Sequence, residues 1–185
     1  VSIKSCLSYT FSVSNSQGTS LIKDRPFTAE MTRSIMLLKE KPYRPRMADY
    51  RIGVFFTGRE QLGEGAKTTV PVYYANRWDI QPSDTAAYLR GEKVKPTKQI
   101  VFYIDNTFPE KWKPYLREGV TQWNELFEQI GFKDVVAAKD FPTDDPEFDP
   151  DNIKYSCVRY APSSIENAMG PSWVDPRSGE ILNAS

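Results

Sequence analysis

Carboxylates are concentrated in one loop of this sequence, and they are the side chains best placed to do chemistry. Thirteen residues, 140–152, carry six of them: Asp140, Asp144, Asp145, Glu147, Asp149 and Asp151. Hard oxygen ligands in a loop suit calcium, which takes six to eight oxygens. The spacing does not fit an EF-hand loop. The calcium candidates are therefore Asp144, Asp145, Asp149 and Asp151, and the first alternative is an ordinary solvated acidic loop rich in Asp-Pro turns. A second alternative is a paired-carboxylate hydrolase, although neighbouring aspartates in a loop rarely converge with the separation that this chemistry needs.

Other metal and nucleophile chemistry is restricted by composition. The chain contains no histidine, which is the usual general base near neutral pH and the commonest zinc ligand. A Ser-His-Asp triad, a Cys-His dyad and a histidine-based zinc site are therefore excluded within this sequence. Its two cysteines, Cys6 and Cys157, are far apart and outside any CxxC motif. They are interpreted as buried free thiols, with a disulfide between them as the alternative.

Charge and hydropathy exclude two further classes of partner. The 185 residues carry 24 basic and 24 acidic side chains, so no basic excess indicates a nucleic-acid partner. No apolar run is long enough to span a membrane. The chain begins with Val1 rather than Met, which indicates a processed or excised piece of a longer protein.

The second half of the sequence has the pattern of a strand followed by a long helix. Residues 98–105 form an apolar run rich in β-branched and aromatic side chains, typical of a buried strand. Thr107 and Glu110 fit a capping box. Apolar residues then recur at steps of three and four, which predicts one helix over 114–130 with Pro114 in its first turn and Gly131 after its end.

After the helix, the sequence predicts strands and a closing hairpin. The expected elements are strands at 134–138 and 153–160, an extended edge strand at 168–174, a turn at 175–179 and a returning strand. The first half is expected to be all β. Its elements are strands at 3–13, 27–39, 51–57 and 68–79, a turn at 15–20, a Gly-rich loop at 58–66, and one or two helical turns at 83–90.

Two proline- or glycine-containing segments are predicted to connect these elements. Residues 41–49 hold two prolines and three basic side chains, so they are expected to be an extended surface linker or an arm lying on a neighbouring domain. Residues 91–97 are the expected domain boundary. The domain prediction is thus a β-rich region at 1–90, a linker at 91–97 and a second domain at 98–185.

One family resemblance rests on long runs of this sequence. The runs are VFYIDNTFPEKWKPYLREGVTQWNELFEQIGFKDVVAAKDFPTDDPEFDPDNIKYSCVRY and AMGPSWVDPRSGEILNAS, preceded by PYRPRMADYRIGVFF and YYANRWDI. Together they resemble the front of the catalytic domain, and the β-rich region before it, in large zinc-dependent metalloproteases of the zincin class with a methionine turn. The resemblance implies an α+β fold: an N-terminal all-β piece followed by a truncated zincin-like α/β domain, with a twisted mixed sheet and one long backing helix.

The resemblance also implies a substrate-binding edge. In zincins the edge strand over the cleft pairs with the extended substrate through main-chain hydrogen bonds. By analogy, the substrate-binding residues are Ala168, Met169, Gly170, Ser172 and Trp173. The parent would be a secreted or periplasmic peptidase that acts on a peptide or protein substrate.

The sequence departs from this family at the point that matters most for catalysis. Family members bind zinc through the two histidines of a HExxH helix, whose glutamate activates water. This chain has no HExxH motif and no histidine. We therefore expect zinc only in the full-length parent, no activity from this chain alone, and self-association through apolar surface left uncovered. The alternative is a non-catalytic peptide- or protein-binding module that uses an exposed β-edge.

Overall fold

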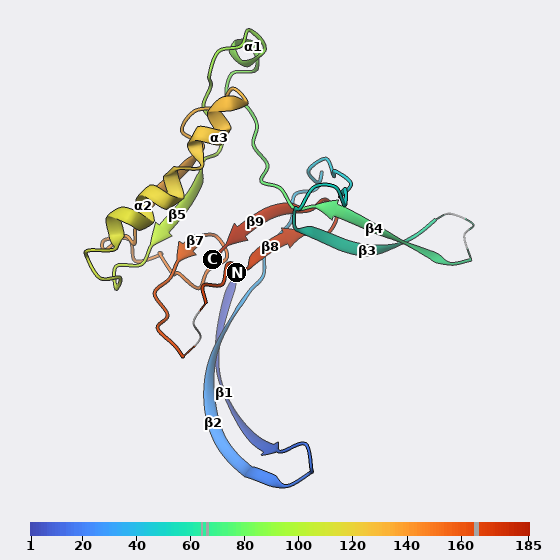
Figure 1. Ribbon diagram of the computed structural model, residues 1–185, viewed down its shortest axis with the longest axis vertical. Coiled ribbons are helices and arrows are strands. Elements are labelled where there is room, and N and C mark those ends of the chain that lie inside the picture. Colours follow the sequence, from blue (N-terminus) through green and yellow to red (C-terminus); the bar gives the residue numbers. More distant parts are fainter. Residues whose placement is uncertain (64, 66, 165–166) are drawn as a thin grey trace. The chain divides into compact units, whose positions relative to one another are not determined.

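The computed structural model describes residues 1–63, 65, 67–164 and 167–185 (Figure 1). The described residues form a strand-rich α+β protein with three short helices, which confirms the coarse fold prediction. They divide into two compact units, Val1–Leu37 and Leu38–Ser185. No helix among the described residues is long and apolar enough to cross a membrane.

The first unit is a long antiparallel hairpin of β1 (Ser2–Ser14) and β2 (Ser20–Ser34). The side chain of Asn15 accepts hydrogen bonds from the backbone N–H groups of Gln17 and Thr19, which closes the turn. The predicted strand at 3–13 and the turn at 15–20 are confirmed. The strand predicted at 27–39 is confirmed as far as Ser34.

Alternation along the hairpin gives it one apolar face and one polar face. Tyr9 lies opposite Phe27, and their rings stack with centroids 5.5 Å apart. The register places the following residues on that apolar face: Ile3, Leu7, Tyr9, Phe11, Val13, Ile22, Phe27, Ala29 and Met31. Several of these side chains are about 40% exposed, and two strands alone form a marginal core in water.

The second unit begins with an arm and a second hairpin. β3 (Phe56–Leu62) pairs with β4 (Thr69–Ala75) in antiparallel fashion. The arm lies along the other edge of β4: Ala48 donates to the carbonyl of Tyr73, and Ala75 donates to that of Arg46. The arm predicted at 41–49 therefore packs on a strand of its own unit.

The predicted boundary between the strand at 51–57 and the loop at 58–66 is wrong. The strand starts only at Phe56 and continues through Leu62. Cross-strand pairing with β4 overrides the glycine signal, because Gly58 lies directly opposite Tyr73. A Cβ at position 58 would lie 3.1 Å from the Tyr73 ring, so glycine permits this close approach. Residues 64 and 66 of the predicted loop lie outside the described residues.

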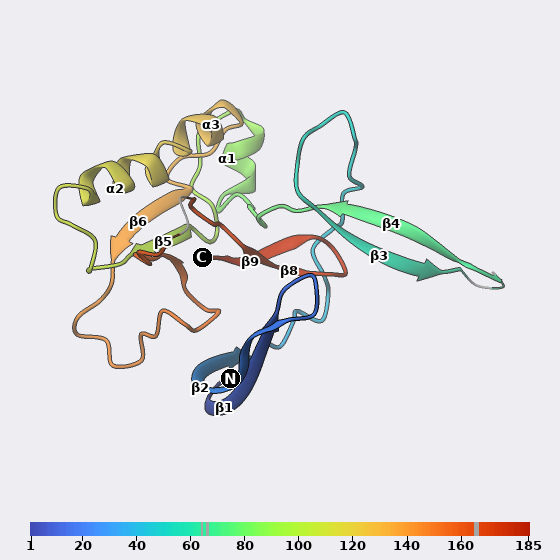
Figure 2. The same ribbon diagram turned by 60° about the horizontal axis from the view of Figure 1, so that its bottom comes forward.

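A parallel sheet and three helices make up the rest of the second unit. β5 (Ile100–Ile104) lies between β6 (Val136–Asp140) and β7 (Ser156–Val158). Figure 2 shows α2 (Lys113–Thr121) and α3 (Asn124–Gln129) alongside β5 and β6, with α1 (Thr85–Leu89) beside α3. The buried core consists of Ala87, Val94, Ile100, Phe132, Val135 and Val136. The strands predicted at 98–105, 134–138 and 153–160 are present, with shorter or shifted limits.

The single backing helix predicted over 114–130 is wrong, because the structure has two helices. The Thr121 hydroxyl donates to the carbonyl of Arg117, a back-bond that bends helices. Asn124 then pairs with the backbone of Val136 in both directions, at 2.8 Å each, and so fixes the start of α3 against β6. The predicted capping box also fails, since Thr107 donates its N–H and hydroxyl to the Asp105 carboxylate. Pro114 does lie in the first turn of α2.

The segment 91–97, predicted as a domain boundary, lies inside the second unit. Val94 is buried in the core and pairs with the Gly131–Lys133 backbone. Val94 and Pro96 are both buried, so this segment is not an exposed linker along its whole length. The structure instead divides after Leu37.

Candidate functional site

The candidate site is the free edge of a closing hairpin, formed by β8 (Ser172–Asp175) and β9 (Glu180–Ala184). The turn and returning strand are confirmed, but the edge strand begins at Ser172 rather than at Ala168. Pro171 has no N–H to contribute to a ladder, which explains the later start. Ala168, Met169 and Gly170 are exposed and precede the strand, while Ser172 and Trp173 lie in it.

The hydrogen bonds of β9 determine which β8 groups point outward. Ala184 is paired with Ser172 but donates its N–H to Ser156, away from β8. Ile181 is paired with Val174 but donates to Arg77, again away from β8. In an antiparallel pair, opposite residues direct their backbone groups the same way, inward or outward. Ser172 and Val174 therefore present their N–H and C=O groups at the outer edge.

This outer edge has no strand partner among the residues that the structure describes. Between the two outward-facing residues lies Trp173, whose side chain is 61% exposed. Sequence reasoning named Ser172 and Trp173 but omitted Val174. The alternation of backbone direction, counted from Ser172, could have identified it.

A buried polar turn holds this hairpin in place. Asp175 is only 2% exposed and accepts hydrogen bonds from the backbone and the guanidinium of Arg177. These hydrogen bonds, opposed by burial, hold the pKa of Asp175 below its usual value, so its carboxylate stays charged. Gly179, with φ of 73°, donates to the Asp175 carbonyl and completes the turn.

Lys39 ties this turn to the segment that follows β4. Its ammonium lies 2.9 Å from Asp79 and 2.8 Å from Glu180, and hydrogen bonds to both carboxylates raise its pKa. Its carbonyl accepts a hydrogen bond from Arg177. Glu180 is buried, so this pairing compensates a charge that would otherwise be costly inside the fold.

The acidic loop does not gather its carboxylates around one point. Asp145 and Asp149 each accept the backbone N–H two residues later, forming Asx-turns. Asp151 forms an ion pair with Arg159. Phe148 anchors the loop by packing on Phe141, Tyr103 and Tyr155. No set of three His, Cys, Asp or Glu side chains within the described ranges is placed to hold a metal ion. The candidates Asp144, Asp145, Asp149 and Asp151 thus lie in a loop organised by turns and an ion pair.

The two cysteines are free thiols, but only one matches its expected environment. Cys157 is buried in β7, and burial raises its pKa to about 11, so the thiol stays protonated and a poor nucleophile. Cys6 is exposed on the polar face of the first hairpin, contrary to the prediction that both are buried.

A family model matches the N-terminal part of this chain. It covers residues 1–83 and is described as a domain of unknown function, DUF5117. The match includes both N-terminal hairpins but not the parallel sheet or the β8–β9 hairpin. No curated protein and no solved structure matches the chain.

Proposed function

We propose that this chain provides the peptide-pairing edge of an extracytoplasmic zinc-dependent peptidase. The observation that carries the proposal is the outer edge of β8, where the backbone groups of Ser172 and Val174 have no strand partner among the described residues. The sequence resemblance supports the peptidase class. In this proposal the chain captures and orients an extended peptide, and bond cleavage takes place elsewhere in the parent protein.

The geometry of the edge suits β-augmentation. An added antiparallel strand needs donors and acceptors at alternate residues, which Ser172 and Val174 supply. Trp173 offers a large, half-exposed surface to side chains of the bound segment. Because the recognition is mainly backbone to backbone, it would tolerate many substrate sequences.

The residues of this chain do not fit a zinc site. The sequence has no histidine, and the described residues hold no cluster of metal-ligating side chains. We therefore derive no catalytic step from this chain. The zinc ligands and the catalytic base would come from a HExxH segment in the full-length parent.

The alternative is a stand-alone module that binds peptides or proteins through the same edge. The two functions differ in the parent protein, which should bind zinc and cleave a generic protein substrate only if the peptidase proposal holds. A parent that contains no zinc and cleaves nothing would refute the peptidase, and would leave peptide capture as the function to test.

Peptide capture itself is tested with paired variants at one position. Ser172→Pro removes an outward N–H, whereas Ser172→Ala keeps the backbone and removes only the hydroxyl. With a blocked, β-prone peptide as the probe, fluorescence anisotropy should show about tenfold weaker binding for Ser172→Pro, since one backbone hydrogen bond is lost and the strand is disturbed. Ser172→Ala should bind like wild type. Equal binding by both variants, with unchanged thermal melts, would refute pairing at this edge.

We also propose that the isolated chain self-associates. The apolar face of the β1–β2 hairpin supports this, because its aromatic side chains remain about 40% exposed and would gain from burial against a second copy.

A further inference from the structure

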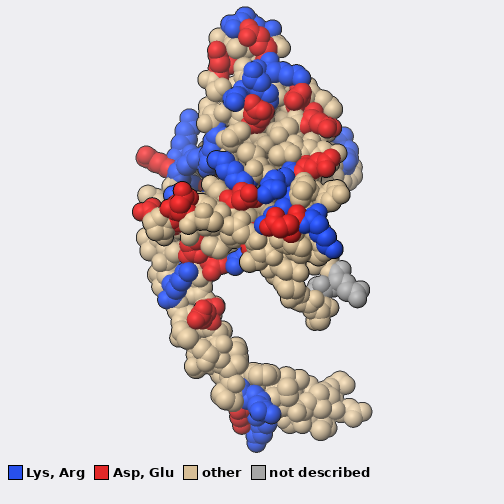
Figure 3. Space-filling model, turned by 90° about the vertical axis from the view of Figure 1, so that its left-hand side faces the viewer, with Lys and Arg blue, Asp and Glu red and all other residues tan. Residues whose placement is uncertain are grey.

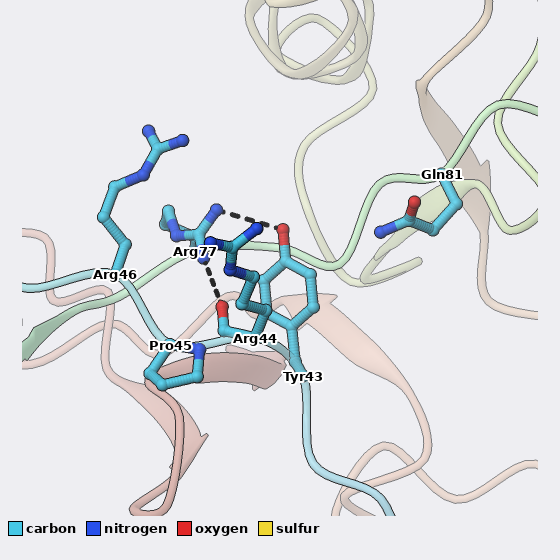
Figure 4. A pocket seen from close by; sticks show the side chains of 6 residues that line it. All are labelled: Tyr43, Arg44, Pro45, Arg46, Arg77 and Gln81. Carbon is cyan, nitrogen blue, oxygen red and sulfur yellow. Dashed lines mark hydrogen bonds between the residues drawn. The ribbon is translucent and has the colours of Figure 1, made fainter.

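A second feature lies where the arm at residues 41–49 passes the segment after β4. A cavity of about 480 Å³ lies at this place, a size typical of small-molecule sites. Figure 4 shows the side chains that line it. Its lining is mostly polar and consists of Tyr43, Arg44, Pro45, Arg46, Arg77 and Gln81. None of these residues carries a negative charge, although three are arginines.

Arg77 is a fixed wall of this cavity. Its guanidinium donates to the Tyr43 hydroxyl at 3.1 Å and to the Arg44 carbonyl at 2.8 Å, and lies 4.6 Å from the centre of the Tyr43 ring. Its backbone donates to Gly179 and accepts from Ile181. Its Nε is a buried donor with no partner among the described residues. Arg77 is thus rigidly held with its hydrogen-bonding capacity incompletely used.

The charges around the cavity are unbalanced. Arg44 and Arg46 form no ion pair with any residue that the structure describes. Asp79 interacts electrostatically with Arg77, but its carboxylate already accepts hydrogen bonds from Lys39 and Gln81. Acidic and basic side chains are intermingled on the face drawn in Figure 3, and the chain carries equal numbers of each. A general positive field is therefore absent, and attraction of an anion to the cavity must come from the local arginines.

Two uncharged side chains that line the cavity add a hydrogen-bond donor and a hydrogen-bond acceptor to the arginines. The Tyr43 hydroxyl accepts from Arg77, which leaves its own proton free to donate outward. Gln81 uses its N–H₂ group toward Asp79, so its carbonyl oxygen is available as an acceptor. Pro45 restricts the backbone of Arg44 to extended conformations, which limits the entropy lost when these side chains engage a ligand.

We propose that this cavity binds a small molecule through a carboxylate, phosphate or sulfate group. The guanidinium of Arg44 supplies paired donors that match two anionic oxygens, and Tyr43 adds a neutral donor. Gln81 accepts from a hydroxyl or N–H elsewhere on the ligand. Arg46 points away from the other lining side chains in Figure 4 and supplies charge at the rim. This inference does not depend on the proposed peptidase function.

The test is a titration of the intact chain with inorganic phosphate and, separately, with acetate. Chloride keeps the ionic strength constant, and amide chemical shifts of residues 43, 44, 46 and 77–81 report binding at the cavity. We expect saturable binding of at least one of the two anions. Arg44→Gln should weaken it about tenfold, because a charge-assisted hydrogen bond is lost. Arg44→Lys, which keeps the charge but not the paired donors, should lie between wild type and Arg44→Gln.

Arg25→Gln is the matched control, since it removes the same charge from the exposed first hairpin. Because the Arg44 side chain has no ion pair to lose within the described ranges, its variants should melt like wild type. Stronger binding of phosphate than acetate would assign a tetrahedral anion, and the reverse a planar carboxylate. The proposal is overturned if neither anion gives saturable shifts at the cavity, or if Arg44→Gln and Arg25→Gln weaken binding equally.

Discussion

Substitution of Gly179 by alanine tests how closely the β8–β9 turn is fitted to the rest of the second unit. Gly179 has φ of 73°, a left-handed conformation that costs an alanine about 1 kcal/mol. A Cβ there would also lie 2.6 Å from the Ala75 carbonyl oxygen and 3.3 Å from the Tyr74 Cβ. Because the obstacle at Ala75 is backbone, the turn or β4 must move.

The expected cost follows from these two contributions. Overpacking against a fixed wall typically costs about 1–3 kcal/mol, so Gly179→Ala should lower the free energy of unfolding by roughly 2–4 kcal/mol in total. Gly91 provides the matched control. It has φ of 85°, and a Cβ at this position would meet no atom of the described residues within 4 Å, so Gly91→Ala should cost only the backbone strain of about 1 kcal/mol.

Urea unfolding followed by tryptophan fluorescence measures this difference. All four tryptophans, Trp78, Trp112, Trp123 and Trp173, belong to the second unit, so the signal reports on that unit. The midpoint should fall for both variants and clearly further for Gly179→Ala, with an unchanged slope. Equal midpoints for the two variants would refute the claim that the Ala75 carbonyl blocks a side chain at this turn.

Three further predictions concern charge, thiol chemistry and association. The pKa of Asp175 is lowered in the folded state. The carboxylate therefore stabilises the fold above its unfolded pKa of about 4, and this contribution is lost as the pH falls through the folded pKa. In thermal melts at a series of pH values, Asp175→Asn should flatten the acid side of the curve of stability against pH. A thiol reagent at neutral pH should label Cys6 quickly and Cys157 only in denaturant, as mass spectrometry would show, and equal labelling rates in the native protein would contradict the burial argument. Phe27→Lys should reduce concentration-dependent self-association in sedimentation experiments, whereas Thr28→Lys on the opposite face of the hairpin should not. A wild-type chain that stays monomeric at high concentration would rule out the proposed association.

The sequence was most informative where hydrophobic periodicity and turn chemistry agree. The alternation of Tyr9, Phe11 and Val13 identifies the first strand, and the apolar run at 98–105 identifies β5. The sequence predicted the wrong limits for helices and strands where tertiary contacts determine those limits. The pairing of Asn124 with β6 divides a helix that periodicity alone would make continuous, and the Tyr73 ring keeps Gly58 in a strand.

The candidate sites show the same distinction between local and tertiary information. Ser172 and Trp173 could be named from a sequence run, but the outward direction of the β8 backbone depends on the hydrogen bonds that β9 makes with Ser156 and Arg77. The arginine cavity was not predicted at all. Arg44 and Arg46 are visible as basic residues of a proline-containing arm, but Arg77 joins them only because the arm packs along β4.

One backbone connection links the two proposed sites, and this leads to a last prediction. Arg77 donates to the Gly179 carbonyl and accepts from Ile181, so the same residue forms a wall of the cavity and holds the β8–β9 hairpin. Under native conditions, Gly179→Ala should therefore weaken both peptide binding at the edge and anion binding at the cavity, because the clash with Ala75 displaces this connection. Arg44→Gln should weaken anion binding alone, since its side chain lines the cavity and the β8–β9 hairpin is held by other residues. Titrating both variants with both probes separates the effects, and normal anion binding by a destabilised Gly179→Ala protein would show that the two sites are mechanically independent.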